Sequence, residues 1–144
     1  MTNIPSLKMG LIRMKFDHIG IFAKTLEHGR RHLQALLPIS AVSDEFHDSL
    51  LKVSVQFLYD SSGICYEIVA PNGAGNPVDS TLSKKRNILN HVAYKVNNFQ
   101  FTIDRLRQCG CIPLGTPKAA VAFGGVRVIF FLTPLSMIIE IIEE

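Results

Sequence analysis

Two histidines and two glutamates are the residues of this chain whose types and spacing could do chemistry. His18 lies in the stretch Asp17-His18-Ile19-Gly20-Ile21, and His91 lies in the similar stretch Asn90-His91-Val92-Ala93-Tyr94. Each histidine is followed by an acid inside an apolar run, Glu67 in the first case and Glu140 in the second. The separations His18–His91 and Glu67–Glu140 are both 73 residues (91 − 18 and 140 − 67). This shared offset indicates a tandem duplication that keeps one histidine and one glutamate in each half.

Such a set predicts a site for a divalent metal ion. An ionised carboxylate on a largely apolar strand is costly unless a cation compensates it. Two imidazole nitrogens and two carboxylate oxygens suit Zn²⁺, Ni²⁺, Co²⁺, Mn²⁺ or Fe²⁺, and the sequence does not choose among these ions. Two carboxylates neutralise the ion and leave positions for water or a bidentate substrate. We therefore predict that His18, Glu67, His91 and Glu140 bind one metal ion.

The elements that must position these residues follow the same offset. Val53, Val55 and Phe57 recur as Val126, Val128 and Phe130. Alternation and apolar periodicity predict the order β-α-β-β-β in each half. The first half is expected to hold strands at 15–22, 41–43, 51–59 and 64–70, with a helix between Thr25 and Pro38. The second is expected to hold strands at 88–96, 112–114, 126–132 and 137–142, with a helix between Asn97 or Asn98 and Gly110.

These elements predict a single α+β domain over residues 15–144, with helices on one side of mixed sheets. We expect module one at 15–71, a linker at 72–86 that begins with the Pro- and Gly-rich stretch 71–77, and module two at 87–144. Residues 1–14 form an N-terminal extension without the features of a signal peptide.

Composition narrows the class of protein. The net charge of +3 is not clustered as in nucleic-acid-binding proteins, and no apolar run is long enough to cross a bilayer. Three cysteines, an odd number, argue against a disulfide framework and favour a cytoplasmic location. We expect no nucleic-acid partner and no membrane partner.

The chain resembles the vicinal oxygen chelate superfamily, which includes glyoxalases, bleomycin-resistance proteins and dioxygenases. The resemblance extends over nearly all of residues 15–143. It rests on the two histidine stretches, on Tyr66-Glu67-Ile68-Val69-Ala70-Pro71, on Gly124-Gly125-Val126-Arg127-Val128 and on Ile139-Glu140-Ile141. It implies a glyoxalase-like fold, in which two βαβββ modules form a cupped sheet around a metal that positions 18, 67, 91 and 140 hold.

Within that superfamily the chain is most similar to methylmalonyl-CoA epimerase. The similarity is carried by Glu67-Ile68-Val69-Ala70-Pro71, and by Pro117-Lys118 followed by Gly124-Gly125. It implies a metal-dependent isomerase that removes an α-proton next to a carbonyl, with Glu140 and Glu67 as the catalytic acids, one on each face of a planar intermediate. The expected partners are a small-molecule substrate, either an acyl-CoA or a thiol adduct, and a second copy of the chain in a homodimer. Whether the modules close within one chain or across that dimer stays open.

Two other functions remain open. A lactoylglutathione lyase of the glyoxalase I type shares the order His-Glu-His-Glu and would act on a thiol adduct of a 2-oxoaldehyde. A non-catalytic protein that binds an antibiotic or another small molecule needs no such ligand set.

The chain also departs from the epimerase pattern. Some epimerases carry an additional acid in the strand that matches residues 51–59, where the nearest polar residue here is Gln56. The basic stretch Lys84-Lys85-Arg86 in the linker could meet coenzyme A phosphates, although a solvated turn explains it equally simply. His28 and His32 have helical i, i+4 spacing without an acid between them, and we expect both at the surface.

Overall fold

The computed structural model describes residues 13–83 and 89–144, and one mixed sheet runs through this part of the chain. Its nine strands follow the order β2-β3-β4-β1-β5-β9-β8-β6, and β7 pairs with β8. The first half contains β1 (Met14–Phe22), α1 (Leu26–Leu36), β2 (Ile39–Asp48), β3 (Val53–Asp60) and β4 (Cys65–Pro71). After α2 (Pro77–Ser83), the second half contains β5 (Leu89–Val96), α3 (Phe99–Gln108), β6 (Ile112–Pro113), β7 (Lys118–Ala119), the short 3₁₀ helix η1 (Val121–Phe123), β8 (Arg127–Leu132) and β9 (Ile138–Glu143).

The two halves repeat the same strand pairing in the same register. β1 pairs with β4 in parallel, with Ile19 opposite Tyr66. β5 pairs with β9 in parallel, with Val92 opposite Ile139, which is the same pair displaced by 73 positions. Backbone geometry thus reproduces the offset that the sequence shows, and the prediction of two βαβββ modules in an α+β fold is confirmed.

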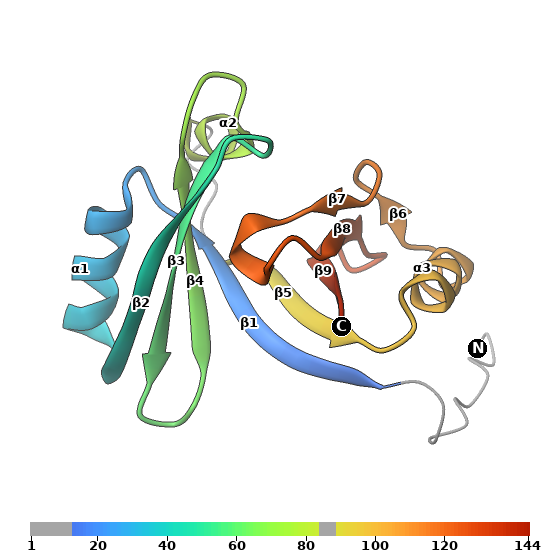
Figure 1. Ribbon diagram of the computed structural model, residues 1–144, viewed down its shortest axis with the longest axis horizontal. Helices are drawn as coiled ribbons and strands as arrows, with labels where there is room; N and C mark the ends of the chain where they lie inside the picture. Colours follow the sequence, from blue (N-terminus) through green and yellow to red (C-terminus); the bar gives the residue numbers. More distant parts are fainter. Residues whose placement is uncertain (1–12, 84–88) are drawn as a thin grey trace.

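The pairing of β1 with β5 joins the halves. These strands run antiparallel along their whole lengths, and Gly20 lies opposite His91. Figure 1 shows the resulting cupped arrangement, with β2, β3 and β4 on one side and β5, β8 and β9 on the other. The inner faces of both halves point toward each other across the middle of the molecule.

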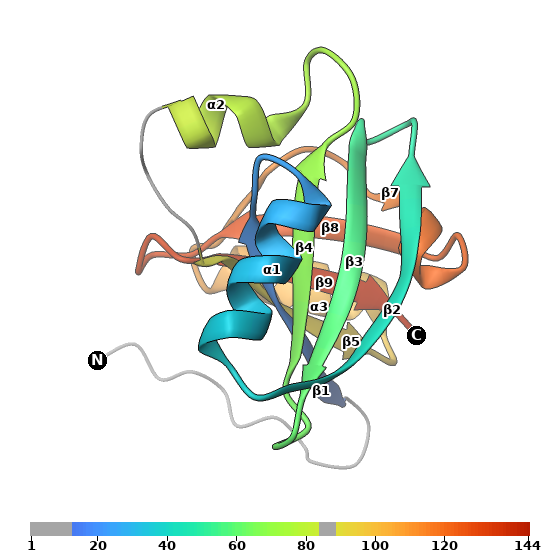
Figure 2. The same cartoon turned by 90° about the vertical axis from the view of Figure 1, so that its left-hand side faces the viewer.

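Each half covers its outer face with one helix. Leu58, Ile68 and Ala70 pack under α1, while Ile129, Phe131 and Ile141 pack under α3. Figure 2 shows α1 lying across β3 and β4. The Thr25 side chain accepts a hydrogen bond from His28 N and caps α1, as predicted.

β2 differs from the short strand that the sequence predicts at 41–43. It is ten residues long and ends at Asp48. Because β2 is an edge strand, both of its faces are partly exposed, and its polar residues give no clear alternation for pattern analysis to detect.

The corresponding part of the second half is broken into β6, β7 and η1, where a single strand at 112–114 was expected. Pro113 and Pro117 interrupt the strand, and Gly115 adopts a φ of 103° between them. Both short strands still pair with β8, and η1 follows directly after β7.

Helix α2 lies in the segment that we expected to link the modules, where the sequence analysis assigned no helix or strand. Asn76 Oδ1 accepts hydrogen bonds from Val78 N and Asp79 N, and Pro77 occupies the first helical position. Val78 is fully buried against the first-half cluster of Val53, Val55 and Phe57, so the short helix is fixed by packing.

Some predictions fall outside the described residues. They concern most of the N-terminal extension, the start of the strand predicted at 88–96 and the stretch Lys84-Lys85-Arg86. None of the helices in residues 13–83 and 89–144 is long and apolar enough to span a membrane.

Gly29 is required for close packing of α1 on the sheet. A Cβ at this position would lie 2.7 Å from Ile68 Cγ2 and 3.0 Å from Ala23 Cβ. Alanine improves helix propensity by about 0.5–1 kcal/mol, but overpacking costs about 1–3 kcal/mol. We expect Gly29→Ala to lower the free energy of unfolding by about 1 kcal/mol in urea titrations, while Gln34→Ala, on the exposed side of α1, changes it little. Stabilisation by Gly29→Ala would contradict the close approach.

Candidate metal centre

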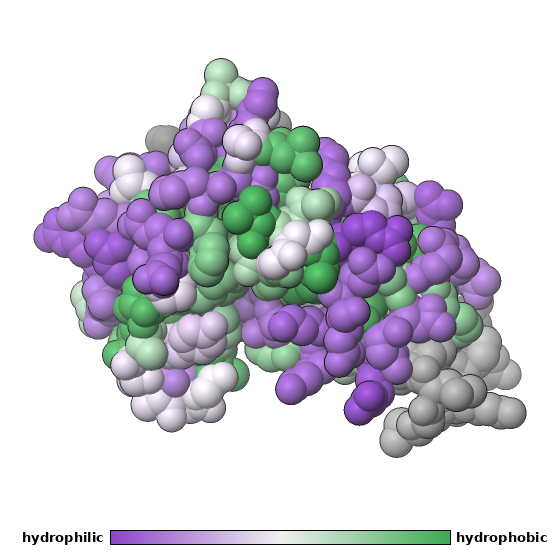
Figure 3. Space-filling model, viewed as in Figure 1, coloured by the Kyte–Doolittle hydropathy of each residue, from purple (hydrophilic) through white to green (hydrophobic). Residues whose placement is uncertain are grey.

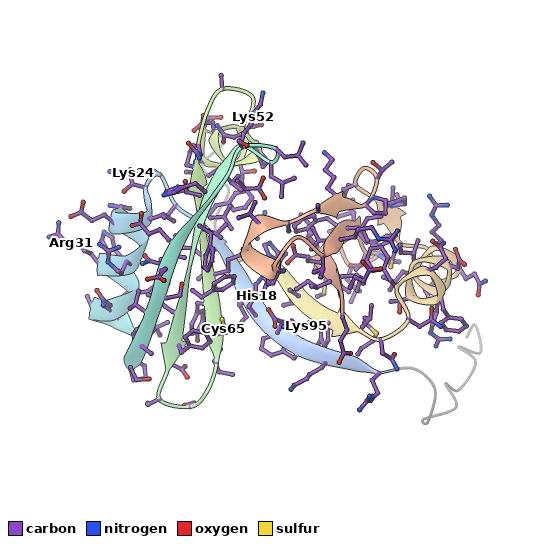
Figure 4. The ribbon with its side chains drawn as sticks, viewed as in Figure 1. His18, Lys24, Arg31, Lys52, Cys65 and Lys95 are labelled. Atoms are coloured by element: carbon purple, nitrogen blue, oxygen red, sulfur yellow. The ribbon has the colours of Figure 1, made fainter. Side chains whose placement is uncertain are left out.

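The four residues singled out by the offset come together on the inner face of the sheet. His18 is on β1, Glu67 on β4, His91 on β5 and Glu140 on β9. Glu67 lies opposite Gly20 of β1, and Glu140 lies opposite Ala93 of β5. All four side chains are buried. Figure 4 shows His18 in the middle of the molecule, where the two halves meet, while Arg31 points outward from α1 and Lys24 lies in the loop before this helix.

The two imidazoles face each other through their Nε2 atoms, which are 3.1 Å apart. Glu140 Oε1 is 3.2 Å from Nε2 of His18 and 3.6 Å from Nε2 of His91. Glu67 Oε1 is 3.6 Å from both Nε2 atoms. The donor atoms of His18, His91 and Glu140 all lie within 4.8 Å of one another, and Glu67 is not a member of this tighter group.

The outer ring nitrogens are held by the residue that precedes each histidine. His18 Nδ1 is 2.7 Å from Asp17 Oδ2, and His91 Nδ1 is 2.8 Å from Asn90 Oδ1. Because both oxygens are acceptors, these contacts assign a donating N–H to each Nδ1 and direct the Nε2 lone pairs inward. Lys95 Nζ lies 3.6 Å from Asp17 Oδ1 and balances its charge. Asp17 and Asn90 are again 73 positions apart. This regularity was present in the sequence, but the sequence analysis assigned these two residues no role.

Aromatic rings surround the imidazoles. Phe57 packs edge-on against His18 with ring centroids 5.8 Å apart, and Phe130 packs edge-on against His91 at 5.2 Å. These phenylalanines are related by the same offset of 73. Phe123, which the sequence analysis missed, stacks on His18 with centroids 5.7 Å apart and an interplanar angle of 10°.

This apolar setting shifts the ionisation of all four groups. Burial opposes charge on His18, but the hydrogen bond to Asp17 and the carboxylates of Glu140 and Glu67 outweigh it and raise the pKa to about 10. Burial and the charge of His18 lower the pKa of His91 to about 3. Burial raises the pKa of Glu67 to about 8 despite the attraction of His18, and burial also raises the pKa of Glu140.

The donor set fits a divalent metal ion. Two lone pairs 3.1 Å apart repel unless a cation or a proton lies between them. With both Nε2 atoms unprotonated, the buried Glu140 Oε1 has no hydrogen-bond donor among the described residues, a situation that costs about 1–3 kcal/mol. His18, His91 and Glu140 could therefore hold a metal ion, with Glu67 beside them.

A cavity of about 530 Å³ leads to this cluster. Glu67, His91 and Glu140 line its floor, and apolar side chains from both halves line its walls. In the space-filling view, hydrophobic residues gather in the middle of this face, between the two halves (Figure 3). The cavity is large enough for a small organic substrate to reach the buried carboxylates.

Two polar residues of the first half, Gln56 and Asp48, lie in different surroundings. Gln56 lies on the face toward α1, where Arg30 Nη1 donates to its Oε1, so it does not line the cavity. Asp48, which the sequence analysis did not single out, does line it. His28 and His32 lie together on the outer side of α1, away from this site, with ring centroids 4.5 Å apart.

The family model described as the glyoxalase/bleomycin resistance protein/dioxygenase superfamily matches residues 17–130. The chain therefore belongs to this superfamily, as its resemblance to the vicinal oxygen chelate proteins predicted. No curated protein matches it in sequence.

Solved structures share its fold. The crystal structure of methylmalonyl-CoA epimerase from Mycobacterium tuberculosis aligns with a TM-score of 0.74 and 19% identity, over 90% of this chain and 87% of the other. A hypothetical protein from Bacillus halodurans aligns with a TM-score of 0.70 and 21% identity, over 91% and 94%. A variant of Streptomyces coelicolor methylmalonyl-CoA epimerase in complex with 2-nitronate-propionyl-CoA aligns with a TM-score of 0.74 and 18% identity, over 92% and 96%.

Gly20 leaves the space that the His91 imidazole occupies. A Cβ at position 20 would overlap His91 Cε1 and Nε2, so Gly20→Ala must turn the imidazole away from His18. We expect metal affinity to fall at least about tenfold, as when the orientation of a ligand is lost, while circular dichroism still shows a folded sheet. Isothermal titration with Zn²⁺ measures the loss. Ala93→Gly, at the equivalent position of the second half, is the matched control, and equal effects of both variants would contradict this role of Gly20.

The pKa values of the cluster predict how stability depends on pH without metal. His18 has an ordinary pKa of 6.5, raised to about 10, and Glu67 has an ordinary pKa of 4.5, raised to about 8. Above pH 6.5 the folded protein therefore binds protons that the unfolded chain has released, and stability falls as pH rises toward 10. The pKa of His91 is lowered from 6.5 to about 3, so this residue makes stability rise with pH only below pH 6.5. It adds no pH dependence above that value.

We therefore expect the melting temperature of chelator-treated protein to decrease between pH 6.5 and 10, and saturating Zn²⁺ to remove most of this decrease. Calorimetry at several pH values measures both effects. A metal-free protein whose melting temperature stays level across this range would show that His18 does not retain its proton.

Proposed function

We propose that this protein is a metal-dependent isomerase that removes and returns the α-proton of a carboxylated acyl thioester, in the manner of methylmalonyl-CoA epimerase. The observation that carries the proposal is the pair of buried glutamates at the cavity floor. Glu67 and Glu140 come from equivalent strands of the two halves and approach the same pair of imidazoles. Two acids in such positions suit proton transfer on both faces of a planar carbon.

Each of the four site residues would have a defined role in this proton transfer. His18, His91, Glu140 and Glu67 would hold the metal ion, which would supply stabilisation of negative charge on the substrate oxygens. One glutamate accepts the α-proton from one face of the carbon, and the other returns a proton to the opposite face. Burial raises the pKa of Glu67 in the metal-free site, and a bound cation would oppose this shift and favour the carboxylate form, which accepts a proton.

Supporting residues orient the ligands and exclude water. Asp17 and Asn90 hold the outer nitrogens of the histidines and so direct their lone pairs. Phe57 and Phe130 exclude water around the carboxylates and strengthen each electrostatic interaction there. The apolar cavity walls accept the carbon chain of an acyl group. The epimerase structures with a similar fold, one of them holding 2-nitronate-propionyl-CoA, support an acyl-CoA as the substrate.

A glyoxalase I-type lyase is the second candidate. The observation that favours it is that the acid of each half is a glutamate close to both histidines, the His-Glu-His-Glu order of that family. The same pair of carboxylates would move a proton between adjacent carbons of a thiol adduct of a 2-oxoaldehyde. Both candidates share α-proton removal and differ in substrate.

Solvent deuterium uptake separates these candidates. We expect metal-loaded protein in D₂O to exchange the α-proton of methylmalonyl-CoA, observed by NMR, and a chelator to stop the exchange. Each epimer is supplied separately, because an acid that serves one face is needed for only one of them. Glu67→Gln should then retain exchange of one epimer and Glu140→Gln exchange of the other, with the impaired direction slowed about 10²–10⁴-fold.

Glu143→Gln is the control on the same strand, since Glu143 pairs with Arg127 at the surface. Metal content is measured for every variant, so that lost ligation is distinguished from lost proton transfer. Failure of the wild-type protein to exchange methylmalonyl-CoA would refute the epimerase activity, and thiol adducts of methylglyoxal would be the next substrates.

A further inference from the structure

A segment of the second half crosses onto the first half beside the cavity. Helix η1 follows β7, and Ala122 and Phe123 pack against the first-half cluster that contains Val53, Val55 and Phe57. In Figure 2 this orange segment lies beside the end of β2. Phe123 also packs against the second-half cluster of Ala93, Ala120, Val128 and Ile142. It therefore touches the apolar cores of both halves.

Asp48 fastens this segment to the first half. Its Oδ2 accepts a hydrogen bond of 3.2 Å from Val121 N, the residue at the equivalent position of the second half. Its Oδ1 accepts from Leu50 N at 3.1 Å and from Leu51 N at 2.9 Å and thereby shapes the turn after β2. Asp48 is 5% exposed, and N–H groups occupy both of its oxygens. Such a carboxylate is suited to holding backbone in place.

The fastened segment ends at the ring that covers His18. Phe123 stacks on the imidazole and meets the edge of Phe57 with centroids 5.7 Å apart. Phe123 lines the cavity, whereas His18 is fully buried behind it. Phe123 therefore helps to fix the plane of the His18 ring, which Asp17 and Phe57 also contact, and it separates this ring from the cavity.

We propose that Asp48 is a positioning residue for the metal centre: its hydrogen bond to Val121 N holds Phe123 over His18. This inference concerns how the ligand is held and applies to any substrate. The contact depends on the two accepting oxygens of a carboxylate, because an amide offers only one.

Two substitutions break the contact from opposite sides. Asp48→Asn can keep its accepting oxygen on Leu50 N and Leu51 N, but its NH₂ group then faces the donor Val121 N. Val121→Pro removes the donor itself. Ala120 has φ −115° and ψ 123°, which suits a residue before proline, and Val121 is the first residue of η1 and half exposed. The proline variant therefore keeps the proposal testable if Asp48→Asn does not fold.

Asp60→Asn is the matched control. Asp60 caps the β3–β4 turn in the same way, since its Oδ1 accepts from Ser62 N at 2.9 Å and Ile64 N at 2.9 Å. Asparagine can preserve both of these bonds, and the turn lies away from the metal centre.

The first measurement is hydrogen–deuterium exchange of the peptide 120–126 in metal-free protein, which reports the contact itself. The second is the rate at which Zn²⁺-loaded protein releases its metal to an excess of chelator, which reports the effect on His18. We expect Asp48→Asn and Val121→Pro each to increase both rates about tenfold. The double variant should increase them no further, because both changes remove one interaction. Asp60→Asn should match the wild type.

Three results would overturn the proposal. Unchanged exchange of 120–126 in both variants would show that the contact does not hold the segment. Faster exchange with unchanged metal release would show that the segment does not position His18. Multiplied effects in the double variant, or an equal increase in Asp60→Asn, would show that the substitutions act through general stability.

Discussion

The antiparallel pairing of β1 with β5 is the constraint on which the rest of the structure depends. It places two buried imidazoles with their Nε2 atoms 3.1 Å apart, an arrangement that is repulsive without a cation or proton between them. The neighbouring strands β4 and β9 add one carboxylate each to this position. The helices on the outer faces and the aromatic rings on the inner faces stabilise the sheet against the cost of burying four ionisable groups.

The parts of the site that could be predicted from the sequence are those that the duplication repeats. His18 and His91, like Glu67 and Glu140, are separated by 73 residues, and strands in equivalent registers must bring such pairs together. Asp17 and Asn90, which precede the two histidines, are also separated by 73 residues. Their hydrogen bonds to the neighbouring imidazoles depend on side-chain rotamers, which a strand pattern does not specify. Asp17 and Asn90 were therefore visible in the sequence without a role.

The parts that could not be predicted arise where the halves differ. No local periodicity connects Asp48 with Val121, or Phe123 with His18, because these contacts form only when one half closes on the other. The polar residues of an edge strand likewise concealed the length of β2. In the second half the prolines and Gly115 divide the edge strand into β6 and β7, and the η1 segment that follows packs against the first half.

Gly20 and Ala93 occupy equivalent positions, yet only the first lacks a side chain, and the imidazole of His91 fills the volume that a methyl group would need. The two residues therefore form one steric unit across the β1–β5 pairing, although they lie far apart in the chain. A larger side chain at position 20 therefore requires the His91 imidazole to move, and with it the spacing of the two-imidazole centre.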